Sequence, residues 1–427
     1  MMRKLYQERR HVMYMPRIVD AILSDALAAA GGVVVEGPRF CGKTTTAKQN
    51  AQSAVELDKE AGLRLIAQAD PSMILDGQTP RLIDEWQLVP TIWNAIRHEI
   101  DTRNQKGQFI LTGSAVPKDE ATRHSGAGRF VRIAMETMSL SEKQISLSEI
   151  SFSALFDGTA KENAIGGLSV REYIDALFRG GWPGLLDASD KGARMVLENY
   201  VDEIARVDIN FPGEMTHDPE RVRALLRSLA RNTANEFPNS KLAVEAAEGG
   251  NPLSEQTVRN YLDALRRIHI LKDQHGWNTH LRSRIRLIGN PKRHLADPSI
   301  ALAAIGASKE DLSRDGKALG FFFESLAVHD LRVYAKLLGG EVFHYRDSSG
   351  LEIDAIVELR SSRWAGIEIK MPENDIDMAA AHLLALKAKL ADSVSERCAF
   401  LAVITSGQAS YVRPDGVRVI SLGHLCA

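Results

Sequence analysis

Short apolar runs alternate with longer mixed stretches in the first third of the chain. The runs occupy positions 33–35, 54–57, 82–83, 109–111 and 130–133. The stretches between them carry helical patterns, such as that of residues 91–97. Short apolar strands that alternate with helices are typical of a parallel sheet covered by helices. We therefore predict an α/β fold with a parallel sheet for residues 30–135.

The pattern changes after this segment. Residues 136–220 are mainly helical, with a strong turn signal at Gly180-Gly181-Trp182-Pro183-Gly184. Residues 221–300 suggest several helices followed by short strands. From Phe321 onward the predicted order is a helix, three β-rich segments, a helix and further β-structure. This organisation predicts four parts with the boundaries 1–145, 146–220, 221–305 and 306–427.

The composition is that of a globular protein. The 427 residues are 44% hydrophobic and 25% charged, with a formal net charge of −2, which excludes disorder of the whole chain. Three cysteines are too few for a disulfide framework, which favours a reducing compartment. No apolar run reaches the roughly 18 residues of a membrane span, and the basic start lacks the apolar core of a signal peptide. We therefore expect a cytoplasmic protein with no membrane contact.

The near-neutral total hides a basic middle. Between Arg221 and Arg293 there are 14 Lys and Arg against 6 Asp and Glu. Such an excess is typical of an anion-binding surface, and equally of a charged face in contact with solvent. DNA or RNA is therefore one candidate partner of this segment, and a protein is the other.

The most specific motif is G-x-x-x-x-G-K-[ST], which lies between an apolar strand and a helix. Its residues and the threonine after it are Gly37, Pro38, Arg39, Phe40, Cys41, Gly42, Lys43, Thr44 and Thr45. Glycines let backbone N–H groups surround a phosphate, and the start of the following helix adds a positive field. Lys43 is expected to reach the β- and γ-phosphates and Thr44 to coordinate Mg²⁺. The motif therefore predicts a site for a nucleoside triphosphate with Mg²⁺.

Hydrolysis requires an acidic element, and the strand at 82–83 ends in Asp84 and Glu85. We predict that Asp84 holds Mg²⁺ and that Glu85 polarises the attacking water. The strand at 109–111 ends in Thr112, where a polar side chain can sense the γ-phosphate, although an ordinary strand exit is the alternative.

Arginines follow these elements at positions 123, 129 and 132. One of them, with Arg129 as our candidate, is expected to stabilise transition-state charge in its own chain or in a neighbouring subunit. The second case predicts a homo-oligomer.

Several of these segments resemble a family of bacterial and archaeal AAA-type ATPases that carry a C-terminal domain of unknown function. They are Lys43-Thr44-Thr45, Ile83-Asp84-Glu85-Trp86-Gln87, Leu111-Thr112-Gly113-Ser114, Ser125-Gly126-Ala127-Gly128-Arg129 and Met138-Ser139-Leu140-Ser141-Glu142. The resemblance implies ATP as the nucleotide. It also implies a sheet in which the Thr112 strand lies between the phosphate-loop strand and the Asp84 strand.

The basic middle contains a further pattern. Residues 252–265 predict a helix with Ser254 as N-cap and an apolar face that includes Val258 and Leu262. Arg282, Arg284 and Arg286 alternate along a predicted β-hairpin after it. A helix followed by a basic hairpin resembles a winged helix, which binds DNA through its helix in the major groove or serves as a protein-interaction module.

Charged residues near the C-terminus form the last candidate site. Glu368 and Lys370 lie two apart on a predicted strand and share a face, and Asp354 on the neighbouring strand can meet Glu368. These carboxylates suit Mg²⁺, with Lys370 orienting a bound water and Glu324, from the preceding helix, as an accessory ligand.

This arrangement resembles the PD-(D/E)XK nuclease superfamily, whose core runs helix, three strands, helix, strand. The resemblance implies a nuclease-like fold, which is either active or retained as an inert binding module.

These predictions combine into one architecture. It consists of an AAA-type P-loop domain (1–145), a helical linker (146–220), a winged-helix-like basic module (221–305) and a nuclease-like domain (306–427). The leading hypothesis is a Mg²⁺-dependent ATPase that acts as a nucleotide-driven switch or motor on nucleic acid. The alternatives are a protein-interaction ATPase with an inert C-terminal domain, and a metal-dependent nuclease regulated by ATP.

Overall fold

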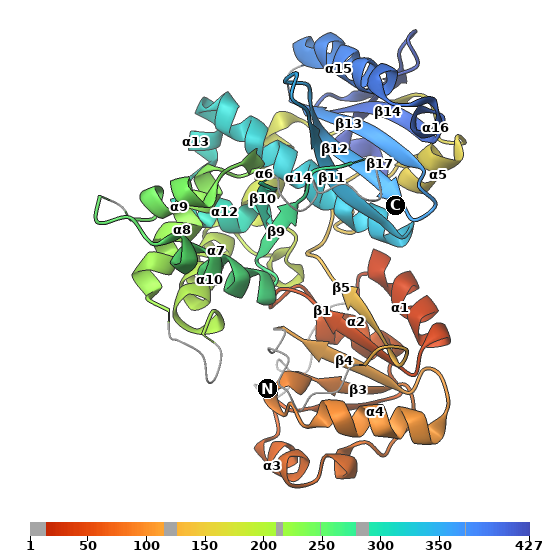
Figure 1. Ribbon diagram of the computed structural model, residues 1–427, viewed down its shortest axis with the longest axis vertical. Coiled ribbons are helices and arrows are strands. Elements are labelled where there is room, and N and C mark those ends of the chain that lie inside the picture. Colours follow the sequence, from red (N-terminus) through yellow and green to blue (C-terminus); the bar gives the residue numbers. More distant parts are fainter. Residues whose placement is uncertain (1–13, 115–125, 211–216, 248, 279–289, 372) are drawn as a thin grey trace, which may run out of the picture.

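The computed structural model describes residues 14–114, 126–210, 217–247, 249–278, 290–371 and 373–427. Figure 1 shows an N-terminal sheet domain, a helical region beside it, and a second sheet domain formed by the C-terminal residues. The candidate residues Arg123, Arg282, Arg284 and Arg286 lie outside the described residues.

The N-terminal domain is built on a five-stranded sheet of order β2-β3-β4-β1-β5, in which all pairs are parallel. Its strands are β1 (Gly32–Glu36), β2 (Ser53–Glu56), β3 (Arg81–Asp84), β4 (Phe109–Gly113) and β5 (Phe130–Ala134). Its helices are α1 (Ile18–Ala29), α2 (Lys43–Asn50), α3 (Ala61–Ala69) and α4 (Ile92–Arg103). The predicted parallel α/β fold is confirmed, including the position of β4 between β1 and β3.

Both faces of this sheet are buried, because alternate residues of β1 enter different cores. Val33 and Val35 pack in the cluster that includes α1, whereas Val34 packs with Trp93 and Ile96 of α4 on the other face. A strand covered on both sides has no polar alternation. This burial explains why β1 is a continuous apolar run in the sequence.

The middle of the chain is largely helical. Its helices are α6 (Val170–Arg179), α7 (Asp190–Glu203), the π-helix η4 (Ile204–Asp208), α8 (Pro219–Arg231), α9 (Asn239–Glu245), α10 (Glu255–Arg267), α12 (Pro298–Ile305) and α13 (Lys309–Arg314). A small antiparallel sheet of order β8-β10-β9 accompanies them, formed by β8 (Asn235–Glu236), β9 (Leu271–Gln274) and β10 (Lys292–Leu295). Ser254 caps α10 by accepting from the Thr257 amide, as its sequence predicts.

The C-terminal domain has a seven-stranded sheet of order β11-β12-β13-β14-β16-β15-β7. The C-terminal strands are β11 (Gly340–Arg346), β12 (Glu352–Leu359), β13 (Trp364–Lys370), β14 (Cys398–Thr405), β15 (Ala409–Val412) and β16 (Arg418–Ser421). The helices α14 (Gly316–Leu337) and α15 (Ile376–Lys389) pack in different hydrophobic clusters and so cover opposite faces of the sheet. The predicted order of a helix, three strands, a helix and a strand is present from α14 to β14.

One predicted boundary differs from the packing. The segment 146–220 was expected to form one helical unit, but β7 (Ala164–Ile165) pairs with β15, and β6 (Ile150–Ser151) pairs with β17 (Leu425–Cys426). The short helix α5 (Phe152–Asp157) also packs on this domain, where Phe152 and Phe156 contact Phe400 edge to face. Of these elements, β7 thus joins the C-terminal sheet and β6 forms a separate two-stranded sheet with β17, both long-range pairings that no local pattern encodes. Of the described helices, none is long and apolar enough to span a bilayer.

Candidate functional site

The phosphate loop joins β1 to α2 at the carboxyl edge of the parallel sheet. Gly42 has a φ of 104°, a left-handed conformation that glycine adopts without steric cost. A Cβ at Gly37 would collide with the Met135 carbonyl oxygen. The Lys43 ammonium is buried and donates to the carbonyl oxygens of Gly37 and Pro38 at 3.0 and 2.9 Å. The loop therefore already curves around the amino group that is predicted to meet phosphate.

Three oxygen-bearing side chains, from α2, β3 and β4, come together beside the loop. Thr44 Oγ1 donates to Asp84 Oδ1 at 2.8 Å, and the Thr112 hydroxyl donates to the same carboxylate oxygen. Asp84 is only 3% exposed, so its charge is screened little by solvent. A threonine hydroxyl and a carboxylate are the oxygen donors that Mg²⁺ takes in phosphate-binding loops. The residues present thus fit a Mg²⁺–nucleotide complex.

Glu85 is held in an unusual backbone conformation directly after β3. Its φ is 53°, in the left-handed region. Its carboxylate accepts hydrogen bonds from the Gln87 side chain and, at 3.2 Å, from Ser114 Oγ. Since Ser114 follows β4, two neighbouring strand ends fix the orientation of this carboxylate.

A cavity of about 610 Å³ opens over these groups. Lys43, Thr44, Glu85 and Ser114 line it from the N-terminal domain, and Pro183 and Gly184 line it from the helical region. This volume lies in the range of small-molecule and cofactor pockets.

The helical region contacts the phosphate loop directly. Arg39 Nη1 lies 2.7 Å from Asp208 Oδ1 of η4, and the Tyr200 hydroxyl donates to the Arg39 carbonyl oxygen at 3.0 Å. A Cβ at Gly184 would collide with the Phe40 ring. The predicted Gly-Gly-Trp-Pro-Gly turn therefore places a glycine where the loop aromatic packs.

A second support comes from Arg17, which sequence reasoning missed. Its buried guanidinium donates to the Cys41 and Glu136 carbonyl oxygens, both at 2.9 Å, and to Glu142 Oε1 at 3.1 Å. Glu142 belongs to one of the segments that carry the family resemblance. That segment was the only hint in the sequence that Glu142 has a structural role. Arg17 itself precedes α1 in a stretch without a recognisable motif.

Arg129 lies away from the phosphate loop, whereas Arg132 reaches Glu36 at the end of β1, directly before the loop. The Arg129 carbonyl accepts from the Gly32 amide at the start of β1, which is the edge of the sheet opposite the loop. Its side chain pairs with Asp101 of α4 at 2.7 Å. Arg132 pairs with Glu36 and lies over the Trp93 ring. The expectation that Arg129 reaches the nucleotide of its own chain is therefore wrong in this structure, because β5 runs parallel to β1 and begins at the distant edge.

The C-terminal candidates do meet one another. Lys370 Nζ lies 2.8 Å from Asp354 Oδ2 and 2.7 Å from Glu368 Oε2. Glu324 is linked to Asp354 through the ammonium of Lys292, a residue of β10 that the sequence did not single out. Burial and the Asp354 charge raise the pKa of Glu324 to about 7 and that of Glu368 to about 9. Lys292 thus places a positive charge among carboxylates that were predicted to bind a metal ion.

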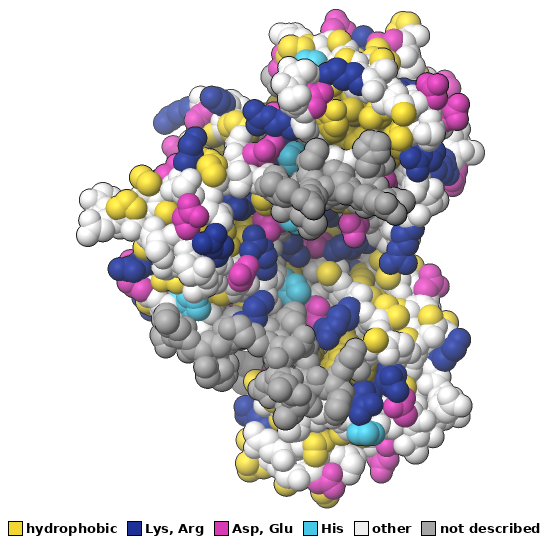
Figure 2. Space-filling model, viewed as in Figure 1, with side chains coloured by type: hydrophobic (Ala, Val, Ile, Leu, Met, Phe, Trp, Pro, Cys, Tyr) yellow, Lys and Arg dark blue, Asp and Glu magenta, His cyan; other side chains and the backbone are white. Residues whose placement is uncertain are grey.

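The basic excess of the middle segment is largely used within the chain. Arg266 pairs with Asp263 and Asp273, and Lys272 pairs with Glu136 of the N-terminal domain at 2.8 Å. Lys272 and Arg266 also line a cavity of about 960 Å³ between the three parts of the chain, within the hollow visible in Figure 2. These internal ion pairs leave fewer positive charges of the middle segment available to bind an external anion than its composition predicts.

Comparisons with known proteins agree with this geometry. Residues 30–144 match a family described as an AAA domain. Residues 170–311 and 319–425 match two domains of unknown function, DUF8612 and DUF4143. The N-terminal residues therefore form a P-loop nucleotide-binding domain of the AAA type.

Relatives that match most of the chain also exist. The chain is 26% identical over 368 residues to uncharacterized proteins of Mycobacterium tuberculosis and Mycobacterium bovis, which covers 83% of this chain and 73% of each relative. Among solved structures, it is similar to a Walker-type ATPase of Pyrococcus abyssi at 14% identity and a TM-score of 0.41, covering 67% of this chain and 94% of that one. A second is a signal-transduction ATPase with numerous domains and a tetratricopeptide-repeat sensor, from Pyrococcus horikoshii. Its identity is 11% and its TM-score 0.20, over 76% of this chain and 49% of that one. Because both TM-scores are below 0.5, the assignment rests on the family match and the site.

Proposed function

We propose that this protein binds and hydrolyses Mg-ATP and converts its nucleotide state into a movement of the helical region. The observation that carries this proposal is the hydrogen bond from Thr44 to Asp84 beside the phosphate loop, with Glu85 lining the same cavity. Asp208 and Tyr200 contact the loop from the helical side. Contacts to a γ-phosphate order or release the loops that surround it. A change in the conformation of the phosphate loop would therefore first displace η4, which contacts it through Asp208.

The residues of the site have separate tasks. Backbone amides of the loop and Lys43 bind the phosphates, and Thr44 with Asp84 would hold Mg²⁺, which neutralises phosphate charge. Glu85 orients and polarises the attacking water, and Thr112 positions Asp84. Arg129 is at the wrong edge to act on its own nucleotide, so a role for it requires a neighbouring copy, and the homo-oligomer stays a prediction.

Calorimetry and a phosphate-release assay test the ATPase proposal. Wild-type protein should take up one Mg-ATP per chain and release phosphate. K43A should lose both properties, and K48A, which replaces an exposed lysine of the same helix, should retain them. An absence of heat on titration of folded wild-type protein with Mg-ATP would refute the proposal.

We infer that nucleic acid is the partner on which the switch acts, through the module of α8, α9, α10 and the β8-β10-β9 sheet. Three helices with a small antiparallel sheet in this order resemble a winged helix. The exposed face of α10 carries Gln256, Arg259 and Asn260, which are the residue types that read base edges in the major groove.

Salt-dependent gel shifts and DNA-stimulated ATPase rates test this inference. Binding should weaken steeply as salt rises, and R259A/N260A should reduce it while leaving the basal ATPase rate unchanged. The internal pairing of Arg266 and Lys272 favours the second candidate, a protein-interaction ATPase. An ATPase rate that no DNA or RNA alters would decide for that candidate.

A further inference from the structure

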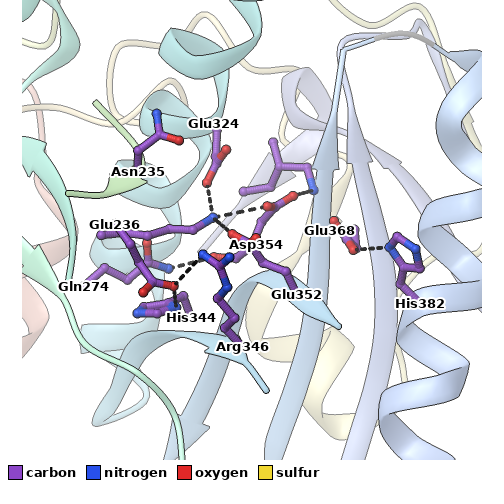
Figure 3. Close-up of polar contacts among 12 residues, drawn as sticks. Asn235, Glu236, Gln274, Glu324, His344, Arg346, Glu352, Asp354, Glu368 and His382 are labelled. Carbon is purple, nitrogen blue, oxygen red and sulfur yellow. Dashed lines mark hydrogen bonds and ion pairs between the residues drawn. The ribbon is translucent and has the colours of Figure 1, made fainter. Parts of the chain in front are cut away.

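A lysine from the middle of the chain occupies the acidic cluster of the C-terminal domain. Lys292 Nζ lies 2.9 Å from Glu324 Oε1, 3.2 Å from Glu352 Oε1 and 3.3 Å from Asp354 Oδ1. These carboxylates come from α14 and β12, whereas Lys292 comes from β10. Figure 3 shows that Glu324, Glu352 and Asp354 converge from the two elements. One ammonium group thus faces three carboxylates, of which Glu324 and Asp354 were expected to serve a metal.

The environment keeps Lys292 charged although it is buried. Its side chain is 4% exposed. A buried ammonium that is paired on three sides is a fixed positive charge.

A second lysine faces the rest of the cluster. Lys370 Nζ pairs with Asp354 and Glu368. Two ammonium groups are thus placed among the four carboxylates of the cluster, and Asp354 contacts both of them.

The strand that carries Lys292 is held against the C-terminal domain by Gln274 of β9 and His294 of β10 itself. Gln274 of β9 donates to the carbonyl oxygens of Phe343 and Asp354 at 2.9 and 2.8 Å. His294, two residues after Lys292, hydrogen-bonds Ser325 of α14 at 3.1 Å and Gln274 at 3.0 Å. The small sheet of the middle module is thus docked against the C-terminal domain.

The cluster in this state does not fit a divalent cation. A metal needs oxygen ligands at about 2.0–2.6 Å, and the space among these carboxylates holds the ammonium instead. The Asp354 Oδ2 atom is also used by the Ile369 amide at 2.9 Å and by Lys370. Over the described part of the chain, no group of three or more His, Cys, Asp or Glu side chains is arranged to hold a metal ion.

We propose that Lys292 is an internal cation that takes the place of a divalent metal and closes the acidic cluster while β10 is docked. The cluster then neither binds metal nor cleaves phosphodiesters, and it ties the middle module to the C-terminal domain.

Replacing Lys292 by a neutral side chain of similar length should open a metal site. Mn²⁺ serves as the probe, with binding followed by electron paramagnetic resonance on the full chain without nucleotide. We expect K292M to bind one Mn²⁺ per chain at least tenfold more tightly than wild type, and K292M/D354N to lose that site. K272M is the matched control, because it removes a lysine of the neighbouring strand that pairs with Glu136 instead.

Any Mn²⁺ binding by the wild-type protein should persist in D354N, because the cluster is closed. Any Mn²⁺-dependent nicking of supercoiled plasmid should likewise persist in D354N. A loss of either one in D354N would assign that property to the cluster and overturn the proposal. A folded K292M that binds no Mn²⁺ would also overturn it. If K292M does not fold, K292M/E324Q replaces it, since it removes one charge of each sign and keeps Asp354 and Glu368.

Discussion

Arg39 of the phosphate loop and Asp208 of η4 form an ion pair across 2.7 Å that joins the nucleotide site to the helical region. The Asp208 side chain is only 8% exposed, and burial raises the pKa of its carboxyl group. The Arg39 side chain, in contrast, is more than half exposed. The two partners therefore contribute unequally, because loss of the arginine leaves a buried charge without a counter-ion.

We predict that R39A destabilises the protein more than D208N does. R39A should lower the free energy of unfolding by about 1–3 kcal/mol, the usual cost of an unsatisfied buried polar group. D208N removes the buried charge and should cost less. Urea denaturation measures both, with R171A at an exposed position of α6 as the control. Equal effects of R39A and D208N would contradict the asymmetry.

We predict that E85Q separates nucleotide binding from hydrolysis. Glu85 is held by Gln87 and Ser114 and lines the cavity, but its carboxylate makes no contact with Lys43 or Thr44 in the structure. The variant should bind Mg-ATP with wild-type affinity and hydrolyse it about 10²–10⁴-fold more slowly, the range for loss of a general base. Single-turnover phosphate release checks this. E60Q, before α3, is the control, and a wild-type rate in E85Q would exclude Glu85 as the water-activating group.

We predict that D84N removes the Mg²⁺ dependence of ATP binding. Asp84 accepts from Thr44 and Thr112 through one oxygen, so an amide at this position loses the anionic ligand that Mg²⁺ requires. The affinity of D84N for ATP with Mg²⁺ should fall to the value that wild type shows in EDTA. Fluorescent-nucleotide titrations in both buffers measure this. A retained Mg²⁺ effect would assign the metal to other ligands.

We predict that His269 contributes to the loss of stability in mild acid. Burial lowers the pKa of His269 from 6.5 to about 3, so the unfolded chain binds a proton below pH 6.5 that the folded protein does not. Stability therefore falls as the pH decreases below about 6.5, by at most about 1.4 kcal/mol per pH unit from this residue.

The variant H269N tests this dependence. Asparagine accepts the left-handed backbone of this position, where φ is 61°. Between pH 7 and pH 5, H269N should lose less stability than wild type, as measured by urea denaturation at each pH. H98N on the exposed side of α4 should follow the wild-type curve. Parallel curves for H269N and wild type would show that His269 is protonated in the folded state.

The two candidate sites differed in how far the sequence predicted them. The phosphate loop was predictable because Gly37, Gly42, Lys43 and Thr44 lie in one short segment whose spacing is fixed by phosphate geometry. The meeting of Asp354 with Glu368 was predictable because strand periodicity places them on one face. Lys292 was not, because it comes from a strand outside that domain and its neighbours in sequence carry no related motif.

The sequence by itself determined the parallel sheet, the phosphate loop and the order of elements in the C-terminal domain, whereas the position of β4 between β1 and β3 was implied by the family resemblance. These features depend on local periodicity and on short motifs, which each segment carries alone. Only the tertiary structure decided that Arg129 lies at the far edge of the sheet, that β6 and β7 pair with strands of the C-terminal domain, and that Lys292 fills the acidic cluster. The reason is physical: strand direction, long-range pairing and the burial of one charge against another arise only when distant segments pack together.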